Sequence, residues 1–424
     1  MDISHLYELY KQSSGVSIDS RTLQDGEMFF AIVGERFDGH QFVDQAIKDG
    51  ASMIVISDES YSREGYTYRV DNTLKCLQDL ANYHRMQFDV PVVAITGSNG
   101  KTTTKELIHA VLSEKYNVFT TNGNYNNHFG VPLTLLSAPI DSEILIIEMG
   151  ANHLHEIDAL CRIAVPNFGL ITNIGQAHIE GFGSYENIIK GKTELYRFLS
   201  EVKGIIFYDD EKKVLIQNLP ADTESIGYLV SDIEFYYSNP TLEFQDVDLE
   251  ERYVTNLYGI YNQANIEAAI TLGRYFKVFD DDIFSALASY VPSMNRSQIK
   301  NVSGITYIMD AYNANPTSMK ASIKSFMNFG KQKKSLILGD MKELGSHAIA
   351  LHKEILEYAQ CYPWDKIILV GPIFKQAAEG IETLCYDNVQ ELKQEYEQLI
   401  KNWTDYTVLL KGSRSMQLEL LLDS

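Results

Sequence analysis

The sequence predicts an α/β protein of three domains, and three observations support this. A chain of 424 residues is too long for one ordinary hydrophobic core. Short apolar runs alternate with segments of helical periodicity, which is typical of mainly parallel sheets covered by helices. One glycine-rich turn follows an apolar run and opens a helix. We place the domains at residues 1–86, 87–292 and 293–424.

The first domain is expected to be a small α/β unit. Residues 28–33 are predicted as a strand, 40–49 as a helix that ends before Gly50, and 52–56 as a second strand. A polar loop, residues 34–40, joins the first strand to the helix.

The second domain opens with the most specific motif of the chain, which follows the apolar run 91–95. Its members are Gly97, Ser98, Asn99, Gly100, Lys101, Thr102 and Thr103. Such a turn points backbone N–H groups and the positive end of a helix dipole at one spot, which suits a polyphosphate. Lys101 would offset phosphate charge, and the Thr102 hydroxyl would hold Mg²⁺. The strict Walker spacing fails at Ile95, and the alternative is a tight turn with a solvent-facing lysine.

Two further strand ends of the second domain supply candidate ligands. Glu148 ends the buried strand 143–148, and His178 lies six residues beyond the strand 169–172. Ligands gather at the carboxyl ends of parallel strands, and hard cations prefer carboxylate oxygen. Glu148 is therefore a candidate for a second Mg²⁺, and His178 for the same metal or the transferring phosphoryl group. The alternatives are a surface carboxylate and a histidine without a ligand.

Lys192 lies where a hydrophobic residue is expected. The predicted helix 184–199 carries an apolar stripe, and helical spacing puts position 192 on that stripe. The lysine could extend its amine outward to water. If it is held inside, desolvation lowers its pKa, and the neutral amine can react with CO₂ to give a carbamate, an anionic oxygen ligand.

The rest of the second domain holds a weaker signal. Asn262 and Asn265 lie three apart at a helix start, where carboxamides suit a purine edge but serve more often as helix caps. The acidic, aromatic stretch 209–258 alternates in short runs and is predicted as a β-rich insertion or edge, without evident chemistry.

The third domain is predicted as a second doubly wound sheet, with strands at 305–309, 335–338, 366–370 and 406–410. Asp310 lies at the carboxyl end of one strand. Lys411 and Arg414 flank Gly-Ser after another, where two cations could clamp a carboxylate or phosphate. The competing interpretation of that segment is a solvated loop.

Composition excludes several classes of protein. A formal charge of −21 argues against binding a nucleic-acid backbone, although local cations could still hold anionic substrates in a cleft. The four cysteines lack metal-ligand spacing and are expected to be reduced and mostly buried. No signal peptide is readable, and no apolar run approaches the roughly 20 residues of a membrane span. We expect a cytoplasmic monomer.

Eight stretches together resemble the Mur ligases, which are ATP-dependent amide-forming enzymes of peptidoglycan synthesis. They are DSRTLQDGEMFFAIVGERFDGHQFV, GSNGKTTTKE, TNGNYNNHFGVPLTLL, EMGANHLHEI, TNIGQAHIEGFGS, DAYNANPTSM, LGDMKELG and KGSRSM. DAYNANP discriminates most, because sister ligases carry a different sequence there. The resemblance implies a domain for a uridine nucleotide, a central P-loop ATPase domain and a C-terminal Rossmann-like domain that closes over ATP.

The resemblance also implies roles for individual residues. Around the UDP end of the substrate it places Ser20, Arg21, Asp38, Gly39 and His40. Around ATP it places residues 97–103, then Asn262 and Asn265 at adenine, and Arg296 and Asp310 from the third domain. Around Mg²⁺ it places Thr102, Glu148, His178 and Lys192, the last matching a lysine that is carbamylated in several members. The muramoyl peptide would meet Asn126 and Asn127, and further peptide or dipeptide contacts would be Asn313, Asn315, Lys411, Ser413 and Arg414.

One departure concerns the start of the third domain. The family often has Gly-Arg there, whereas in this chain Asn295 precedes Arg296. The backbone at position 295 therefore decides whether Arg296 can keep the role that the resemblance implies.

The expected activity joins D-alanyl-D-alanine to a UDP-N-acetylmuramoyl-tripeptide. ATP would phosphorylate the carboxylate, and the dipeptide amine would displace phosphate, with Lys101, Lys192 and His178 as the catalytic candidates. His178 is also the candidate base for the amine. Rival hypotheses are a sister Mur ligase, a folylpolyglutamate synthase, or a nucleotide-driven switch that forms no amide.

Overall fold

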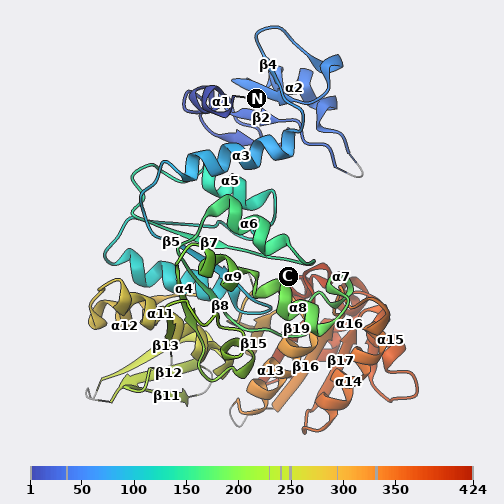
Figure 1. Ribbon diagram of the computed structural model, residues 1–424. Coiled ribbons are helices and arrows are strands. Elements are labelled where there is room, and N and C mark those ends of the chain that lie inside the picture. Colours follow the sequence, from blue (N-terminus) through green and yellow to red (C-terminus); the bar gives the residue numbers. More distant parts are fainter. Residues whose placement is uncertain are drawn as a thin grey trace.

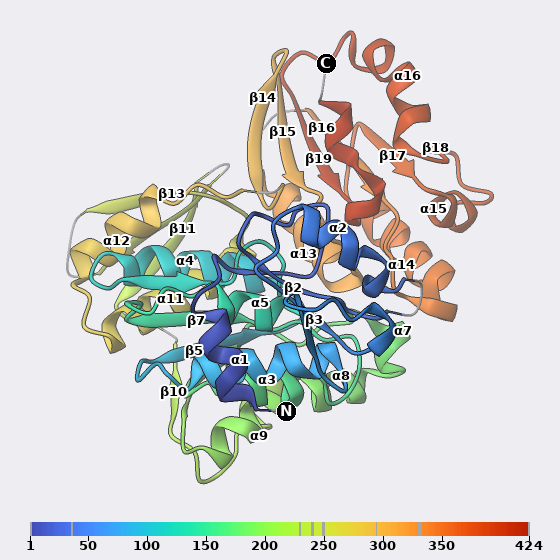
Figure 2. The same cartoon turned by 90° about the horizontal axis from the view of Figure 1, so that it is seen from above.

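The computed structural model describes residues 2–34, 37–228, 230–238, 241–247, 251–293, 295–329 and 333–422. Its described strands form four sheets, three of them in separate α/β domains that follow one another along the chain (Figure 1). The view from above shows the N-terminal domain crossing over the central domain, with the C-terminal domain to one side (Figure 2). The α/β class is confirmed.

The N-terminal domain is a four-stranded parallel sheet in the order β1-β2-β3-β4. Its elements are α1 (Ile3–Tyr10), β1 (Val16–Ser17), β2 (Met28–Phe30), η1 (Gly39–Phe42), α2 (Val43–Lys48), β3 (Met53–Ile56), η2 (Glu59–Tyr61), β4 (Thr67–Arg69) and α3 (Thr73–Arg85). Helix α3 packs on α1 at one side and on α5 and α6 of the next domain at the other. It is thus the main support between the two domains.

Two expected elements of the N-terminal domain are shorter than predicted. The strand predicted at 28–33 ends at Phe30, because the Ile32 amide turns back to the Phe30 carbonyl and the Ile32 carbonyl accepts from Gly39 instead. The helix predicted at 40–49 divides into the 3₁₀ turn η1 and helix α2. The turn is fixed by the Asp38 carboxylate, which accepts from the His40 amide at 3.0 Å.

The central domain is a six-stranded parallel sheet in the order β10-β9-β8-β5-β7-β6. Its elements are β5 (Val92–Thr96), α4 (Lys101–Ser113), β6 (Val118–Thr120), α5 (Gly130–Leu136), β7 (Ile144–Glu148), α6 (Glu156–Ala164), β8 (Phe168–Ile171), α7 (Ile179–Phe182), α8 (Tyr185–Lys192), α9 (Glu194–Glu201), β9 (Ile205–Tyr208), α10 (Lys213–Ile216), β10 (Ser225–Gly227), β11 (Ile233–Ser238), β12 (Thr241–Asp246), β13 (Arg252–Tyr258), η3 (Ile260–Asn262), α11 (Gln263–Tyr275) and α12 (Asp280–Ser289).

The inner strands β5 and β7 of the central sheet are buried along their whole length and consist mainly of apolar residues, as is typical of parallel strands covered on both faces. Along β5, Val92 and Ala94 pack into the core shared with the N-terminal domain, whereas Val93 and Ile95 pack under α4, α11 and α12. The stretch 209–258 contributes the edge strand β10 and a three-stranded antiparallel sheet, β11-β12-β13, which confirms the predicted β-rich insertion.

The helix predicted at 184–199 is interrupted. Helix α8 ends at Lys192, and α9 begins at Glu194. Thr193 between them has a ψ of 0°, and its hydroxyl donates to the Ile189 carbonyl at 2.8 Å, a contact that bends helices. Lys192 therefore lies in the last turn of a short helix.

The C-terminal domain is a six-stranded sheet in the order β14-β15-β19-β16-β17-β18, in which β14 alone runs antiparallel. Its elements are β14 (Gln298–Val302), β15 (Ile305–Asp310), α13 (Pro316–Met327), β16 (Lys333–Gly339), η4 (Gly345–His347), α14 (Ala348–Gln360), β17 (Lys366–Val370), α15 (Pro372–Ala377), β18 (Leu384–Tyr386), α16 (Val389–Ile400), β19 (Tyr406–Lys411), η5 (Arg414–Met416) and η6 (Leu418–Leu421). The predicted doubly wound sheet is confirmed.

All four cysteines are free thiols, but their burial differs from the expectation. Cys76 and Cys161 are buried, whereas Cys385 is half-buried and Cys361 is exposed, because it caps the end of α14 on the outer surface. None of the helices within the described residues has the length and apolar character that crossing a bilayer requires.

Candidate active site

A cavity of about 1360 Å³ lies between the central and C-terminal domains. The carboxyl ends of β5, β7 and β8 open into it, as do the start of α11 and the loop after β15. It brings together these sequence-predicted residues: Ser98, Asn99, Gly100, Lys101, Thr102, Thr103, Asn126, Asn127, Glu148, His178, Asn262, Asn265, Arg296, Asp310, Asn313 and Lys411.

The phosphate loop has the backbone that its glycines allow. Gly97 and Gly100 have φ of 143° and 80°, and a Cβ on Gly97 would lie 2.1 Å from the Thr172 hydroxyl. Lys101 Nζ donates to the Gly97 carbonyl at 2.7 Å, so the lysine folds over the loop into the cavity and does not face bulk solvent. Burial lowers the Lys101 pKa, and the Glu148 charge opposes that effect.

Three of the candidate magnesium ligands, Thr102, Glu148 and His178, line this cavity. Glu148 is 1% exposed; its Oε1 accepts from Asn126 Nδ2 at 2.7 Å, and its Oε2 is buried without a hydrogen-bond partner. Thr102 is buried in the first turn of α4. A buried carboxylate oxygen without a partner and a hydroxyl, lining the same cavity, are oxygen donors of the kind that Mg²⁺ prefers. These residues fit the cation.

Within the described part of the chain, no group of three or more His, Cys, Asp or Glu side chains is arranged so that it could hold a metal ion. The candidate magnesium site includes only Glu148 and His178 of these residue types. It would therefore depend on the Thr102 hydroxyl, on phosphate oxygens and on any oxygen ligand that a modified Lys192 supplies.

Lys192 lies just behind the cavity wall. It is 1% exposed, and its Nζ donates to the carbonyl of Ala151, a lining residue, at 3.1 Å. The outward-extended alternative is wrong. Desolvation, aided by the charge of Lys101, lowers the Lys192 pKa well below its ordinary value. The neutral amine that carbamate formation requires is therefore favoured at this position.

His178 meets the C-terminal domain. Its backbone is left-handed, with φ 55°, and its Nδ1 contacts Oε2 of Glu343. Sequence reasoning missed Glu343, although it lies in the LGDMKELG stretch. No periodicity or strand-end rule indicates which residue of a loop will reach another domain.

The two asparagines at the start of α11 bond to each other. Asn265 Nδ2 donates to Asn262 Oδ1 at 2.8 Å, and Asn262 Nδ2 donates to the Tyr258 carbonyl at 2.7 Å. Asn262 occupies the cap position of α11 but makes no side-chain cap bond, so the capping alternative is wrong. Both residues line the cavity.

Acidic residues line the same end of the cavity and were missed in the sequence. Asp209 and Glu211 follow β9, and Glu267 lies one helical turn beyond Gln263. The strand-end position of Asp209 was a usable signal. Burial raises the pKa of Glu267 to about 7, against an opposing hydrogen bond from Gln263.

Glu267→Gln is expected to flatten the pH dependence of stability. The folded pKa lies above the ordinary 4.5, so the carboxyl contributes stability below that value and loses it as pH rises through about 7. The loss should be about 2 kcal/mol, less than the full shift because the carboxyl borders the cavity. Urea unfolding at pH 4.5 and pH 8 measures it. An unchanged difference between the two pH values in the variant would contradict this assignment.

The backbone at Asn295 resolves the departure from the family pattern. Asn295 has φ 55°, in the left-handed region that glycine favours and asparagine tolerates. Arg296 consequently enters the cavity, with its guanidinium 3.6 Å from the centre of the Tyr312 ring. Arg296 Nε is buried without a hydrogen-bond partner.

Other C-terminal candidates make hydrogen bonds and ion pairs to neighbouring residues of the protein itself. Lys411 is buried and pairs with Asp310 at 3.0 Å, while its Nζ also donates to the Asn313 carbonyl at 2.9 Å. Asn315 caps α13 through Ser318 and donates from Nδ2 to Asn99 Oδ1 at 2.7 Å. DAYNANP thereby contacts the phosphate loop directly.

Several predicted substrate residues lie away from the cavity. The buried Ser413 hydroxyl accepts from the Lys342 amide at 3.0 Å, and the exposed Arg414 pairs with Glu419. Neither lines the cavity, so the predicted clamp is not formed there. Asn127 does line it, but its Oδ1 caps α5 through the Gly130 amide at 2.8 Å.

The N-terminal candidates form a separate group. His40 is 2% exposed; its Nδ1 bonds to Asp38 at 2.6 Å, and its Nε2 accepts from the Ser57 amide at 2.9 Å. A Cβ on Gly39 would lie 2.7 Å from the Ile32 backbone. Exposed Arg21 pairs with Asp19 beside the half-buried Ser20. His40 and Gly39 thus shape the loop, and the accessible groups are Ser20, Arg21 and the partly exposed Asp38 carboxylate.

Three family models match successive parts of the chain. They are the Mur ligase family catalytic domain over residues 12–85, the Mur ligase middle domain over 95–273, and the Mur ligase glutamate ligase domain over 295–414. The chain belongs to the Mur ligase family. Its phosphate loop and Glu148 lie within the middle-domain match.

Individual relatives of this Mur ligase are similar over nearly their whole lengths. The UDP-N-acetylmuramoyl-tripeptide–D-alanyl-D-alanine ligase of Bacillus subtilis is 37% identical, covering 96% of this chain and 91% of the relative. MurF from Acinetobacter baumannii aligns with a TM-score of 0.87 at 28% identity, over 99% of this chain and 97% of that one. MurF ligase from Thermotoga maritima, solved in complex with ADP, aligns with a TM-score of 0.86 at 28% identity, over 98% and 97%.

Proposed function

We propose that this Mur ligase joins D-alanyl-D-alanine to UDP-N-acetylmuramoyl-tripeptide, a step of peptidoglycan synthesis, and converts ATP to ADP and phosphate. The observation that carries the proposal is the whole-length similarity to ligases of that name, one of them solved with ADP. The phosphate loop and the C-terminal groups of this chain line one cavity, which is the arrangement such a reaction needs.

The first step activates the acceptor. A terminal carboxylate oxygen of the tripeptide attacks the γ-phosphorus of ATP, ADP leaves, and an acyl phosphate forms. Both reactants are anions, so the enzyme lowers the barrier mainly by positioning them and neutralising charge. Lys101 is the cation that the phosphate loop brings to the transferring group. Arg296, whose Nε lacks a partner, supplies a second from the C-terminal domain.

Mg²⁺ would be held by Thr102, Glu148, His178 and a carbamate on Lys192, and it would offset charge on the phosphate oxygens. We place His178 with the cation and not with the amine. Its Nδ1 contacts the Glu343 carboxylate, and the other ring nitrogen remains for a ligand.

The second step forms the amide. The dipeptide amine attacks the acyl carbon, the carbon–oxygen bond to phosphate breaks, and the amine loses a proton. The cavity wall formed by the C-terminal domain would keep water from the acyl phosphate. Asn126 and Asn127 would face the muramoyl peptide, and Asn313 the incoming dipeptide. Ser413 and Arg414 are left out, since they do not line the cavity.

The remaining assignments complete the proposal. Residues 1–86 bind the uridine nucleotide through the surface around Ser20 and Arg21, residues 87–292 bind ATP, and residues 293–424 cover it. Asn262 and Asn265 lie at adenine, and Asp310 orients Lys411 beside the nucleotide. The enzyme works as a cytoplasmic monomer.

Mass spectrometry of the product tests the proposal. Purified chain is incubated with ATP, Mg²⁺ and UDP-N-acetylmuramoyl-tripeptides that differ in the third residue, with and without D-alanyl-D-alanine. We expect a product heavier than the acceptor by the dipeptide less one water, with equimolar phosphate. Amide formation with glutamate and a folate, but not with the dipeptide, would show the rival activity. ATP left intact with every pair would indicate a nucleotide-binding switch.

A further inference from the structure

The LGDMKELG stretch, residues 338–345, resembles the family but has no part in the steps above. Leu338 and Gly339 end β16, Gly345 opens η4, and residues 340–344 form the loop between them, whose base is held firmly. The Asp340 carboxylate accepts from the Ile373 and Phe374 amides at 3.1 and 2.8 Å. The Met341 backbone amide donates to His352 Nε2 at 2.9 Å, and the Lys342 backbone amide donates to the Ser413 hydroxyl at 3.0 Å.

Asp340, His352 and Ser413 are buried in the C-terminal domain, so three successive residues of the loop are anchored there. The next residue, Glu343, is therefore presented from a rigid base. The loop also explains Ser413, whose hydroxyl holds the loop and not a substrate.

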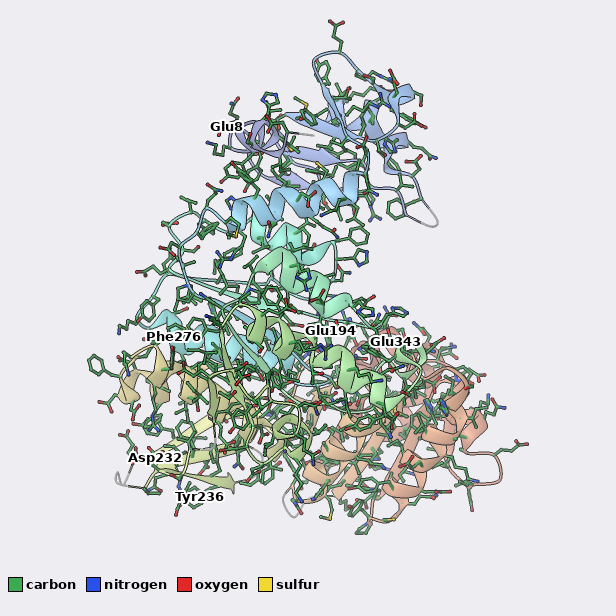
Figure 3. The ribbon with its side chains drawn as sticks, viewed as in Figure 1. Glu8, Glu194, Asp232, Tyr236, Phe276 and Glu343 are labelled. Atoms are coloured by element: carbon green, nitrogen blue, oxygen red, sulfur yellow. The ribbon has the colours of Figure 1, made fainter. Side chains whose placement is uncertain are left out.

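Glu343 reaches across to the central domain. Its Oε2 contacts His178 Nδ1, and its carbonyl accepts from the Glu180 amide at 3.3 Å. A cavity of about 280 Å³ lies beside this contact, lined by both residues and by Glu180. Figure 3 shows Glu343 at the border of the C-terminal domain, next to the helices that follow His178.

The backbone on both sides of the contact is unusual. Glu343 has φ 63° and His178 has φ 55°, in the left-handed region that residues other than glycine seldom adopt. Two such residues facing each other across a domain border indicate that the surrounding structure enforces the contact, as it does at functional sites.

The chemistry of the pair points to a metal ligand. His178 Nδ1 makes no hydrogen bond among the described residues, but a carboxylate in contact with it favours the ring form that carries the proton on Nδ1 and the lone pair on Nε2. Outer carboxylates of this kind commonly change metal affinity by about 10- to 100-fold. Here the carboxylate and the histidine come from different domains, so the pair exists only while the C-terminal domain is docked.

We propose that Glu343 is a positioning residue that makes divalent-cation binding at His178 depend on docking of the C-terminal domain. The inference rests on the proposed function, because it takes His178 as a ligand of the cation. It adds the means by which closure and metal binding are linked.

Mn²⁺ binding to the full chain tests the inference. Electron paramagnetic resonance counts free Mn²⁺ during titration in the presence of β,γ-imido-ATP. We expect Glu343→Gln to weaken Mn²⁺ binding about 10-fold, and Glu343→Asp to recover part of the loss. The matched control is Glu180→Gln, which removes a neighbouring exposed carboxylate that lines the same small cavity and should leave the affinity unchanged.

Two further readouts separate positioning from a structural role. The Glu343 side chain is 51% exposed, so the thermal midpoint of Glu343→Gln should stay within about 2 °C of the parent. The Mg²⁺ concentration for half-maximal turnover should rise, while the KM for the dipeptide should not.

The outcomes are distinguishable. If the parent chain binds Mn²⁺ and Glu343→Gln binds it equally well, the inference is overturned and the proposed function stands. A loss of affinity in Glu180→Gln as large as that in Glu343→Gln would also overturn it, because any nearby charge would then suffice. If the parent chain binds no Mn²⁺ with the nucleotide, the metal assignment in the proposed function fails together with the inference.

Discussion

Lys192→Ala is expected to lower turnover by at least about 10²–10³-fold, the loss typical of removing a group that stabilises charge in the transition state. Lys192 is 1% exposed, and burial lowers its pKa well below the ordinary value, which favours the neutral amine that takes up CO₂. The carbamate that results would extend past Ala151 toward the cavity as an oxygen ligand. Phosphate release with all three substrates measures the effect.

Three controls sharpen the Lys192 experiment. Added bicarbonate should have no effect on the alanine variant, because no amine remains to react, whereas acetate, a small carboxylate, should restore part of the activity. Lys192→Met keeps most of the side-chain volume and should be as inactive, which excludes a simple packing defect. Lys190→Ala removes an exposed lysine of the same helix and should be nearly normal. Near-normal activity of Lys192→Ala would remove this residue from the mechanism.

Lys101→Met is the second change with a large expected effect. Its Nζ lies 2.7 Å from the Gly97 carbonyl, at the loop that we propose to hold the phosphates, and partial burial reduces the screening of its charge by water. Loss of this cation should lower kcat about 10³-fold, since phosphoryl transfer depends on neutralising charge that develops in the transition state. Single-turnover transfer from labelled ATP measures it.

The pattern of the Lys101 result matters as much as its size. A fall in kcat with a smaller change in the KM for ATP would indicate an interaction made mainly in the transition state. Lys101 is the first residue of α4, and Lys115 lies two residues beyond the end of that helix. Lys115→Met removes an exposed lysine that bonds the Lys277 carbonyl and should leave kcat unchanged. A Lys101→Met enzyme with normal kcat would refute the assigned role of the phosphate loop.

Much of the fold could be predicted, because strand and helix periods are local properties of the chain. The strands at 91–95, 143–148 and 366–370 were located to within about a residue, since buried parallel strands are short apolar runs between turn signals. The position of Lys192 on an apolar stripe likewise predicted its burial. Errors arose where side chains override local preference, as at Thr193 and at the turn that Asp38 fixes.

The candidate site could be predicted only in part. Glu148, His178 and Asp310 could be predicted because each follows a parallel strand, and parallel strands present their carboxyl ends at one edge of the sheet. All three line the cavity. They did not indicate Glu343, which reaches His178 from another domain, or Glu267, whose pKa is raised by burial that no sequence period reveals. Asn315 was expected at the substrate and instead bonds to Asn99 of the phosphate loop.

The amino-acid sequence by itself therefore determined the α/β architecture, the phosphate loop and the relationship to an amide-forming family, because each rests on residues close together in the chain. Only the tertiary structure decided which polar groups are left without hydrogen-bond partners, such as Glu148 Oε2. It also decided which groups already bond within the protein, such as His40 and Ser413. The physical reason is that a hydrogen bond is settled by distance in space, and residues far apart in sequence compete for the same donors and acceptors.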